Sequence, residues 1–222
     1  MKQSLALVVI FGWLAMAGPL PAAETDALDQ QIAALQHAWA HIKYQITDED
    51  RQEAEMHALA GRAAALVQKY PGRAEPLIWD AIITSTEAGM SGGLGALSKA
   101  KAARAMLLKA EKIDPTALNG SVYTSLGSLY YQVPGFPLGF GSKKKARRYL
   151  EKALAINPDG IDPNYFYGDF LYRRHDYAEA ARALTHALEA PARPNRPLAD
   201  QGRRQEIRAL LTKVQAHLHS QS

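Results

Sequence analysis

Two stretches of thirteen residues decide the fold: 103–115 (ARAMLLKAEKIDP) and 146–158 (ARRYLEKALAINP). In both, Ala, Leu and Ala follow one another at spacings of four and three residues, and a proline comes five residues after the last alanine. The same triplet returns in residues 180–187. These spacings put the three side chains on one helical face, and proline ends a helix because it lacks the backbone donor. The pattern therefore predicts a helix that repeats along the chain.

A second kind of helix precedes the two later triplets and carries a glycine in its middle. Leu126-Gly127 lies between Tyr123 and Tyr130 in the first case, and Tyr167-Gly168 marks the second. Glycine inside a helix costs about 1 kcal/mol relative to alanine, so its reuse indicates that two helices pack closely there. The order Tyr, Leu-Gly, Tyr, Ala, Leu, Ala, Pro resembles the tetratricopeptide repeat (TPR). We expect an all-α fold, a TPR-like α-solenoid of antiparallel helix pairs with a C-terminal capping helix.

Helical periodicity runs along the chain, without the alternation typical of strands. The expected helices are 26–46, 47–69 (capped by Thr47 or Asp48), 74–88, 96–113, 117–131, 143–156, 162–173, 177–189 and one that begins at Pro197. The expected organisation is a signal peptide (1–23), an N-terminal helical pair (24–70), TPR-like repeats (71–191) and a C-terminal capping helix and tail (192–222).

The N-terminus predicts export. Lys2 precedes an apolar run over residues 5–17, and Gly18 and the prolines after it break the helix before small alanines. This order is typical of a secretory signal peptide, and the run is short for a membrane span. An uncleaved anchor is the alternative. We expect a mature chain that starts near Ala23 or Glu24 and is soluble in the periplasm.

The amino-acid composition excludes several classes of functional site. The 222 residues include no cysteine, which excludes disulfides, iron–sulfur ligation, thiol catalysis and cysteine zinc sites. His37 and His41 have a metal-compatible spacing, yet no carboxylate motif accompanies them. No nucleophile–base motif or dinucleotide fingerprint is present. The sequence thus predicts a protein that is not an enzyme and uses neither metal nor cofactor.

Charge is divided unevenly along the mature chain. Residues 24–141 hold 10 basic and 13 acidic side chains, whereas residues 142–222 hold 15 and 9. A basic half can be a solvated surface, or it can attract anionic lipid, an envelope polymer or an acidic protein. For an exported protein we do not expect nucleic acid as a partner.

Two glycine-rich apolar stretches, 89–95 and 133–141, interrupt helical pairs where a tight turn would suffice. In the second stretch, Phe136, Leu138 and Phe140 would cost free energy in water. Two interpretations remain open for them: packing on the protein's own surface, and contact with a ligand or partner.

Lysines and tyrosines lie next to this second stretch. Lys143 and Lys144, followed by Lys145, stand in the first turn of a helix, where positive charge opposes the helix dipole. They can form a solvated face or hold an anion. Tyr131 and Tyr165 lie off the repeat pattern and can line a groove. We therefore predict one ligand- or partner-binding surface, with the following residues: Tyr131, Phe136, Leu138, Phe140, Lys143, Lys144 and Tyr165.

Several strings in the second half carry a resemblance to a known family. They are residues 130–137 (YYQVPGFP), Gly141 with the lysine run after it, 149–154 (YLEKAL), 157–168 (NPDGIDPNYFYG) and 191–200 (PARPNRPLAD). Together they are similar to the TatT component associated with TRAP transporters. The resemblance covers about residues 120–215, and the earlier half shares only the repeat layout.

This resemblance implies a homotrimeric helical-repeat protein of the cell envelope with a pore or cavity in each subunit. It implies an accessory of TRAP-type solute uptake, with a periplasmic solute-binding protein as partner and a small apolar organic acid, a carboxylate, as ligand. Family members tethered to the membrane need a lipobox cysteine, which this chain lacks. The alternative function is a cell-envelope assembly scaffold that mediates protein–protein interactions.

Overall fold

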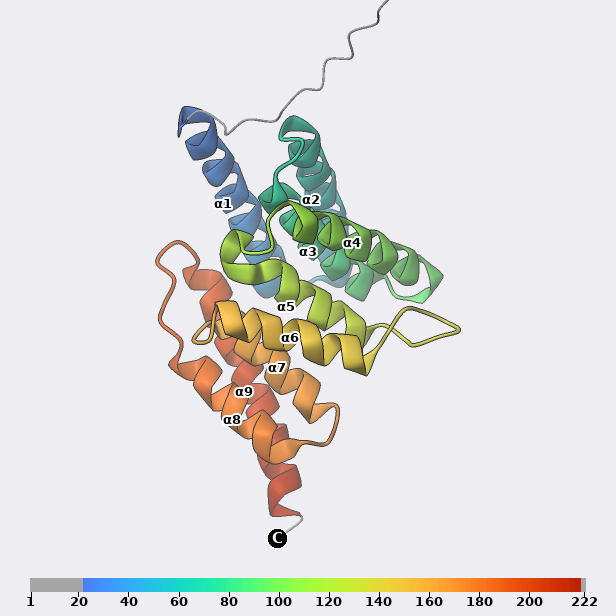
Figure 1. The fold of residues 1–222 in the computed structure, drawn as a ribbon, viewed down its shortest axis with the longest axis vertical. Helices are drawn as coiled ribbons and strands as arrows, with labels where there is room; N and C mark the ends of the chain where they lie inside the picture. The colour runs from blue at the N-terminus through green and yellow to red at the C-terminus, as the bar shows by residue number, and fades with distance from the viewer. Residues whose placement is uncertain (1–21, 221–222) are drawn as a thin grey trace, which may run out of the picture.

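A computed structural model describes residues 22–220 of the chain, which are all-helical apart from their connections (Figure 1). The helices in this part are α1 (Ala22–Gln45), α2 (Glu49–Lys69), α3 (Ala74–Ser91), α4 (Gly93–Ile113), α5 (Ala117–Gln132), α6 (Lys143–Ile156), α7 (Ile161–Tyr172), α8 (Tyr177–Glu189) and α9 (Pro197–His219). The predicted signal segment up to residue 21 lies outside the described residues. Across residues 22–220, no helix has the length and hydropathy needed to cross a bilayer.

The helices stack as consecutive pairs, α3 with α4, α5 with α6, and α7 with α8 (Figure 1). The first helices of the pairs, α3, α5 and α7, contact one another in series. Within the described residues, the backbones of the second helices, α4, α6 and α8, do not approach each other in this way. Long side chains bridge α6 to α4, where Lys152 and Tyr149 reach Glu111. The first helices therefore form an inner row and the second helices an outer row, which confirms the predicted solenoid of helical pairs.

Glycine notches hold the two helices of a pair together. A Cβ added at Gly127 of α5 would lie 2.6 Å from Cγ of Leu150 in α6, and one at Gly168 of α7 would lie 2.6 Å from Cγ of Leu184 in α8. Both leucines are fully buried. The missing side chain thus leaves the space that each leucine fills, which is the physical reason for a glycine in the middle of these helices.

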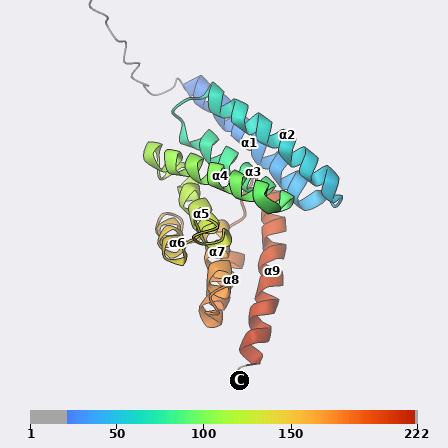
Figure 2. The ribbon, with the colours of Figure 1, turned by 90° about the vertical axis from the view of Figure 1, so that its right-hand side faces the viewer.

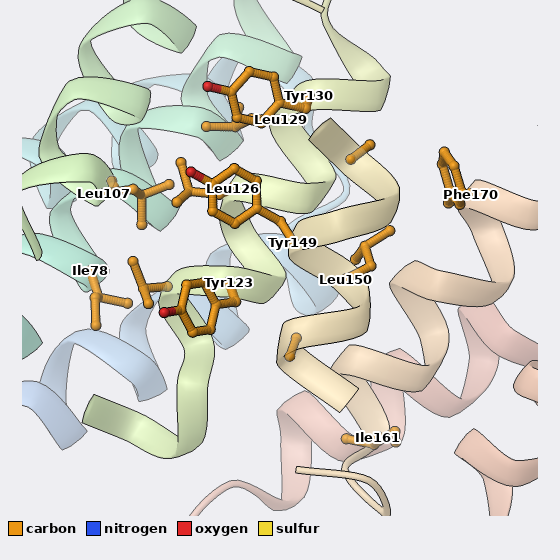
Figure 3. Packing of buried hydrophobic residues seen from close by; sticks show 14 of the residues in the cluster. Ile78, Leu107, Tyr123, Leu126, Leu129, Tyr130, Tyr149, Leu150, Ile161 and Phe170 are labelled. Carbon is orange, nitrogen blue, oxygen red and sulfur yellow. The ribbon is translucent and has the colours of Figure 1, made fainter. Parts of the chain in front are cut away.

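Stacked aromatic rings extend the contact between α5 and α6 (Figure 3). Tyr149 of α6 stacks on Tyr123 and on Tyr130, one on each side along α5, with ring centroids 6.0 and 5.6 Å apart. All three rings are buried. The tyrosines that the sequence assigned to the repeat pattern therefore belong to the core.

The core has two clusters that meet at α3. One joins α1 and α2 and includes Trp79 and Ile83 of α3. The other runs from α3 to α9 and includes Ile78 and Ala81 of the same helix. Because α3 contributes side chains to both clusters, the N-terminal pair is packed directly onto the repeats.

The C-terminal helix closes the molecule rather than only covering its last repeat. α9 packs on α7 and α8, and it also contacts α1 at the other end of the chain (Figure 2). At this contact, a Cβ on Gly202 would overlap the ring of Tyr44. The glycine is therefore needed for the close approach of the first and last helices.

One expectation is wrong. Residues 89–95 do not form a long connector, because α3 continues to Ser91 and α4 begins at Gly93. Gly92 alone separates the helices, and both Gly92 and Gly93 have positive φ, 63° and 64°. Glycine reaches this conformation at no steric cost, so two residues turn the chain where seven were expected. The cap of α2 is as expected, because the Asp48 side chain accepts from the backbone N–H of Arg51.

Replacing Leu150 by alanine tests the repeat register. Leu150 has no exposed surface and fills the Gly127 notch, so Leu150→Ala should lower the free energy of unfolding by about 2–5 kcal/mol. Leu138→Ala is the control, since 73% of Leu138 is exposed and a surface change stays within about 0.5 kcal/mol. Urea denaturation followed by circular dichroism measures both, and equal losses would show that the register is wrong.

The glycine notch predicts that two Gly→Ala variants change the free energy of unfolding in opposite directions. Gly61 lies within α2 with nothing within 4 Å of an added Cβ, so Gly61→Ala should stabilise by about 0.5–1 kcal/mol through helix propensity. Gly127→Ala forces a Cβ against Leu150 and should destabilise by about 1–3 kcal/mol. The same denaturation experiment compares them, and two stabilised variants would refute the notch.

Candidate functional site

The connector between α5 and α6 is a compact loop. The N–H of Gly139 donates to the carbonyl of Gly135 at 3.0 Å, and the N–H of Gly141 donates to that of Pro134 at 2.8 Å. A Cβ at Gly139 or Gly141 would overlap backbone atoms on the other side of the loop. The second predicted insertion is therefore real, and its glycines let the two strands of the loop touch.

The three large apolar residues of this loop have different surroundings. Phe140 is partly buried, with its ring edge-on to Tyr130 at 5.6 Å and the guanidinium carbon of Arg104 in α4 at 4.2 Å from the ring centre. Phe136 and Leu138, in contrast, are 93% and 73% exposed. Self-packing thus accounts for Phe140, whereas Phe136 and Leu138 stand in solvent.

The lysines that follow the loop are also exposed. Lys143, Lys144 and Lys145 form the first turn of α6, which the Ser142 side chain caps by accepting from the N–H of Lys145. None of them has an ion-pair partner among the described residues. Lys145 does lie over the ring of Tyr130, at 5.3 Å.

Tyr131 lies on another side of α5 and contacts α7. Its hydroxyl donates to Oδ2 of Asp169 at 2.7 Å, and its ring packs on Phe170. Burial raises the pKa of Tyr131 well above its usual value, and the negative charge of Asp169 adds to this. Nε of Arg173 contacts Asp169 at 3.1 Å, and 54% of the arginine side chain is exposed. These groups form a fixed polar face on α5 and α7.

Tyr165 lies close to Asp169 and Arg173, the two charged residues that also surround Tyr131. The guanidinium of Arg203 in α9 lies over the Tyr165 ring at 4.3 Å. Burial raises the pKa of Tyr165 to about 12. The structure therefore brings Tyr131 and Tyr165 onto one inner face, whereas Phe140 lies against Arg104 of the outer row. The residues predicted to form one surface therefore lie in two separate places in the fold.

A partly buried ion-pair network surrounds Tyr165 and was not predicted. Asp162 at the start of α7 accepts from Arg193 at 2.8 Å and from Arg203 at 2.9 Å. Arg193 also binds Asp200, which accepts from the Arg193 backbone N–H at 2.8 Å. Arg203 continues to Glu206 at 2.6 Å. The network ties α7, the α8–α9 connection and α9 together.

Lys43 of α1 completes the network by contacting Glu206 at 2.8 Å. Burial by itself would raise the pKa of Asp162, but the charges of Arg203 and Arg193 outweigh it and hold this pKa well below its usual range. Burial lowers the pKa of Lys43, as does the charge of Arg203. The network is thus a charge-balanced junction between the first and last helices.

The sequence did contain a signal for this junction. Asp162 lies in the string 157–168, and Arg193 and Asp200 lie in the string 191–200. These strings carry part of the family resemblance, and their side chains meet in the fold. Pairing the acids of one string with the arginines of the other would have pointed to it.

Arg196 is the surplus cation beside the network. Its guanidinium lies over the ring of Trp79 at 5.2 Å, and its buried Nε has no hydrogen-bond partner among residues 22–220. It lines a small cavity of about 170 Å³ between α1 and the start of α9. A larger hollow of about 480 Å³ lies between residues 192 and 208. Neither hollow is lined by residues of the α5–α6 loop or by Tyr131 or Tyr165.

The histidines considered as metal ligands have other partners. Nε2 of His37 lies 2.7 Å from the carbonyl oxygen of Asn195, and Nδ1 of His41 lies 2.6 Å from the Gln45 side chain. Within residues 22–220, no group of three or more histidines and carboxylates is arranged to hold a metal ion.

Asp80 in α3 is a buried acid outside the ion-pair network. Burial raises the pKa of Asp80 to about 6, and a hydrogen bond from Thr84 opposes this shift.

The paired helices and their inner and outer rows define a TPR-like helical-repeat protein. Among solved structures, the chain is similar to TTC0263, a thermophilic TPR protein of Thermus thermophilus, with a TM-score of 0.57 and 16% identity over 87% of this chain and 95% of that one. It also aligns with Pseudomonas aeruginosa PilF at a TM-score of 0.35 and 16% identity, over 86% and 92% of the two chains. No protein-family model and no curated protein matches the chain. The first likeness shows the fold.

Replacing Asp162 by asparagine tests the junction. Arg193 and Arg203 would lose their shared anion, and the free energy of unfolding at pH 7 should fall by about 2–4 kcal/mol, somewhat below the value for fully buried pairs because 26% of the Asp162 side chain is exposed. Asp159→Asn is the matched control, since 74% of that side chain is exposed, and it should change little.

The same variant predicts a pH dependence. The pKa of Asp162 is lower in the folded state than in the unfolded state. The Asp162 carboxylate therefore contributes its full share of the free energy of unfolding above the unfolded pKa of about 3.9, and this share is lost as the pH falls below that value. The difference between wild type and Asp162→Asn should therefore shrink below about pH 4. Urea denaturation between pH 3 and pH 7 measures it, and a pH-independent difference would contradict the assignment.

Proposed function

We propose that this chain is an exported, non-catalytic TPR-like adaptor that binds a protein partner as an accessory of TRAP-type solute uptake. In this proposal the protein resides in the periplasm, and its partner is a solute-binding protein that holds a small apolar organic acid. The homotrimer that the family resemblance implies is part of the same proposal.

The fold supports the general part of this function. TPR-like repeats present rows of helices as extended surfaces, and such solenoids use their concave surface to bind partners. In this chain the inner row is made of α3, α5 and α7. Protein–protein interaction is therefore the activity that this architecture favours.

The observation that carries the proposal is the polar face on α5 and α7. Arg173 is anchored at its base by Asp169 and keeps 54% of its side chain exposed. Tyr131 is fixed by the same carboxylate. Arginine and tyrosine are enriched among residues that dominate binding energy at interfaces. A prearranged pair of this kind loses little conformational freedom on binding.

The ion-pair junction supports the link to the TatT component. The strings 157–168 and 191–200 both carry the resemblance. Asp162 of the first string forms an ion pair with Arg193 of the second at 2.8 Å. Because side chains of both strings form one network, this contact supports a resemblance in local structure as well as in sequence. TRAP-type uptake is the function that this resemblance implies.

Neutralising Arg173 tests the proposal. The native protein, purified from the periplasm, should carry a TRAP-type solute-binding protein that mass spectrometry identifies. Arg173→Gln should weaken binding of that purified partner at least tenfold by calorimetry, because an anchored interface arginine contributes more than about 1.4 kcal/mol.

Arg182→Gln is the matched control. Arg182 lies on α8 in the outer row, with 72% of its side chain exposed and one intrahelical ion pair. It should bind the partner as the wild type does. Co-purification of envelope assembly proteins without a solute-binding protein would favour the scaffold alternative. Equal binding by both variants would exclude the α5–α7 face.

A further inference from the structure

The α5–α6 loop holds two apolar side chains away from the protein. Phe136 and Leu138, which we call the apolar tip, are 93% and 73% exposed. The loop projects from the body of the molecule at the point where α5 ends and α6 begins (Figure 1). Exposed large apolar residues that stand together on a soluble surface usually mark an interaction site.

The loop is built to hold this tip in place. Gly139 and Gly141 donate across the loop to Gly135 and Pro134, and the N–H of Ser142 donates to the carbonyl of Tyr130 at 2.7 Å. Phe140 ties the base of the loop to Tyr130. The tip therefore projects because of a defined backbone arrangement, and neither of its side chains folds back onto the core.

Positive charge surrounds the base of the loop. Between Asp114 and Glu151 the sequence holds five basic residues and no acidic residue. Between Glu87 and Glu111 it holds four basic residues and, again, no acidic residue. These two segments meet in the fold, where Arg104 of α4 lies against Phe140. In α4, Leu97 and Arg104 lie against the loop, and Lys101 stands between them. We call five exposed basic residues next to the loop, for which the described part of the chain supplies no ion-pair partner, the cationic collar: Lys101, Lys143, Lys144, Lys145 and Arg148.

The position of the lysines costs local stability. Lys143, Lys144 and Lys145 occupy the N-terminal turn of α6, where the helix dipole and the free amides already create a positive potential. No acidic residue stands in that turn to offset it. Positive charge placed against the helix dipole, next to an exposed apolar tip, favours a surface that binds an anion.

We propose that the apolar tip and the cationic collar form a docking site for an anionic phospholipid bilayer. A bilayer presents charged headgroups first and hydrocarbon beneath them. The protein offers the complementary order, with cations around the base of the loop and apolar side chains at its end. Binding of this kind adds burial of apolar area to attraction for anionic lipid.

The shape of the site favours a bilayer over a protein. Interface anchors on proteins usually fit a preformed pocket, whereas a projecting wedge with a ring of lysines needs only a soft apolar layer under negative charge. The base of this loop packs on Tyr130 and on Arg104 of the outer row, whereas Tyr131 packs on α7. The protein can thus contact a membrane and still present its inner face to a partner.

Vesicle sedimentation tests the proposal. The exported protein, purified from the periplasm, is mixed with vesicles of phosphatidylcholine containing about 30% phosphatidylglycerol, or of phosphatidylcholine alone. We expect at least tenfold stronger binding to the anionic vesicles in about 0.1 M salt, and most of it should be lost in about 1 M salt because the Debye length falls from about 10 to about 3 Å. Equal binding to both vesicles, or none to either, would overturn the proposal.

Two groups of variants separate the tip from the collar. Phe136→Ser with Leu138→Ser, and Lys143→Ser with Lys144→Ser and Lys145→Ser, should each weaken binding to anionic vesicles at least tenfold. The matched charge control is Lys109→Ser with Lys112→Ser and Lys213→Ser, three exposed lysines away from the loop; Ile113→Ser, at a residue 39% exposed, is the apolar control. All variants share the same N-terminus, so any contribution from it cancels.

A label at the tip gives a second readout. Because the chain has no cysteine, Leu138→Cys introduces one site for an environment-sensitive fluorophore. Its emission should shift to shorter wavelength with anionic vesicles and be quenched by brominated lipid, whereas the same label at Gln215→Cys on α9 should not change. An unshifted tip label, or tip variants that bind as the wild type does, would refute insertion, and the Arg173 experiment would stand unaffected.

Discussion

The close approach of two helices at a glycine is the constraint on which the rest of the structure depends. Leu150 fills the space above Gly127, and Leu184 fills the space above Gly168. Each contact sets the distance and angle between the helices of one pair, since a Cβ in that place would push them apart. Because these two pairs stack on one another, the repeated notch fixes the spacing of the inner and outer rows over α5 to α8.

The ends of the stack are held by an ion-pair network in addition to apolar contact. Asp162 gathers Arg193 and Arg203, and Lys43 reaches the network through Glu206. Removing ions from water is costly, so such a junction is stable only when each charge finds a partner. Here the partners come from α1, α7, the α8–α9 connection and α9. The network therefore positions the terminal helices as one unit, which apolar packing alone would specify less sharply.

This arrangement divides the surface into faces with different chemistry. On the inner row, Tyr131 and Arg173 are fixed around Asp169, which suits recognition of a protein. On the outer side, the α5–α6 loop exposes Phe136 and Leu138 above unpaired lysines. Both faces begin within the same few residues of α5. Neighbouring residues such as Tyr130 and Tyr131 point to different sides because a helix turns about 100° per residue.

The sequence by itself determined the helical class, the pairs and nearly every helix boundary, because those features follow from local periodicity, glycine and proline. It also identified the exposed loop with its lysines. Only the tertiary structure decided that Phe140 packs on Tyr130, that residues 89–95 turn within two glycines, and that Tyr131 and Tyr165 share a face apart from the loop. The Asp162 junction joins residues far apart in the chain, such as Lys43 and Glu206. Helical periodicity does not say which of these charged residues pair, since ion pairs between distant segments form only once the helices have packed.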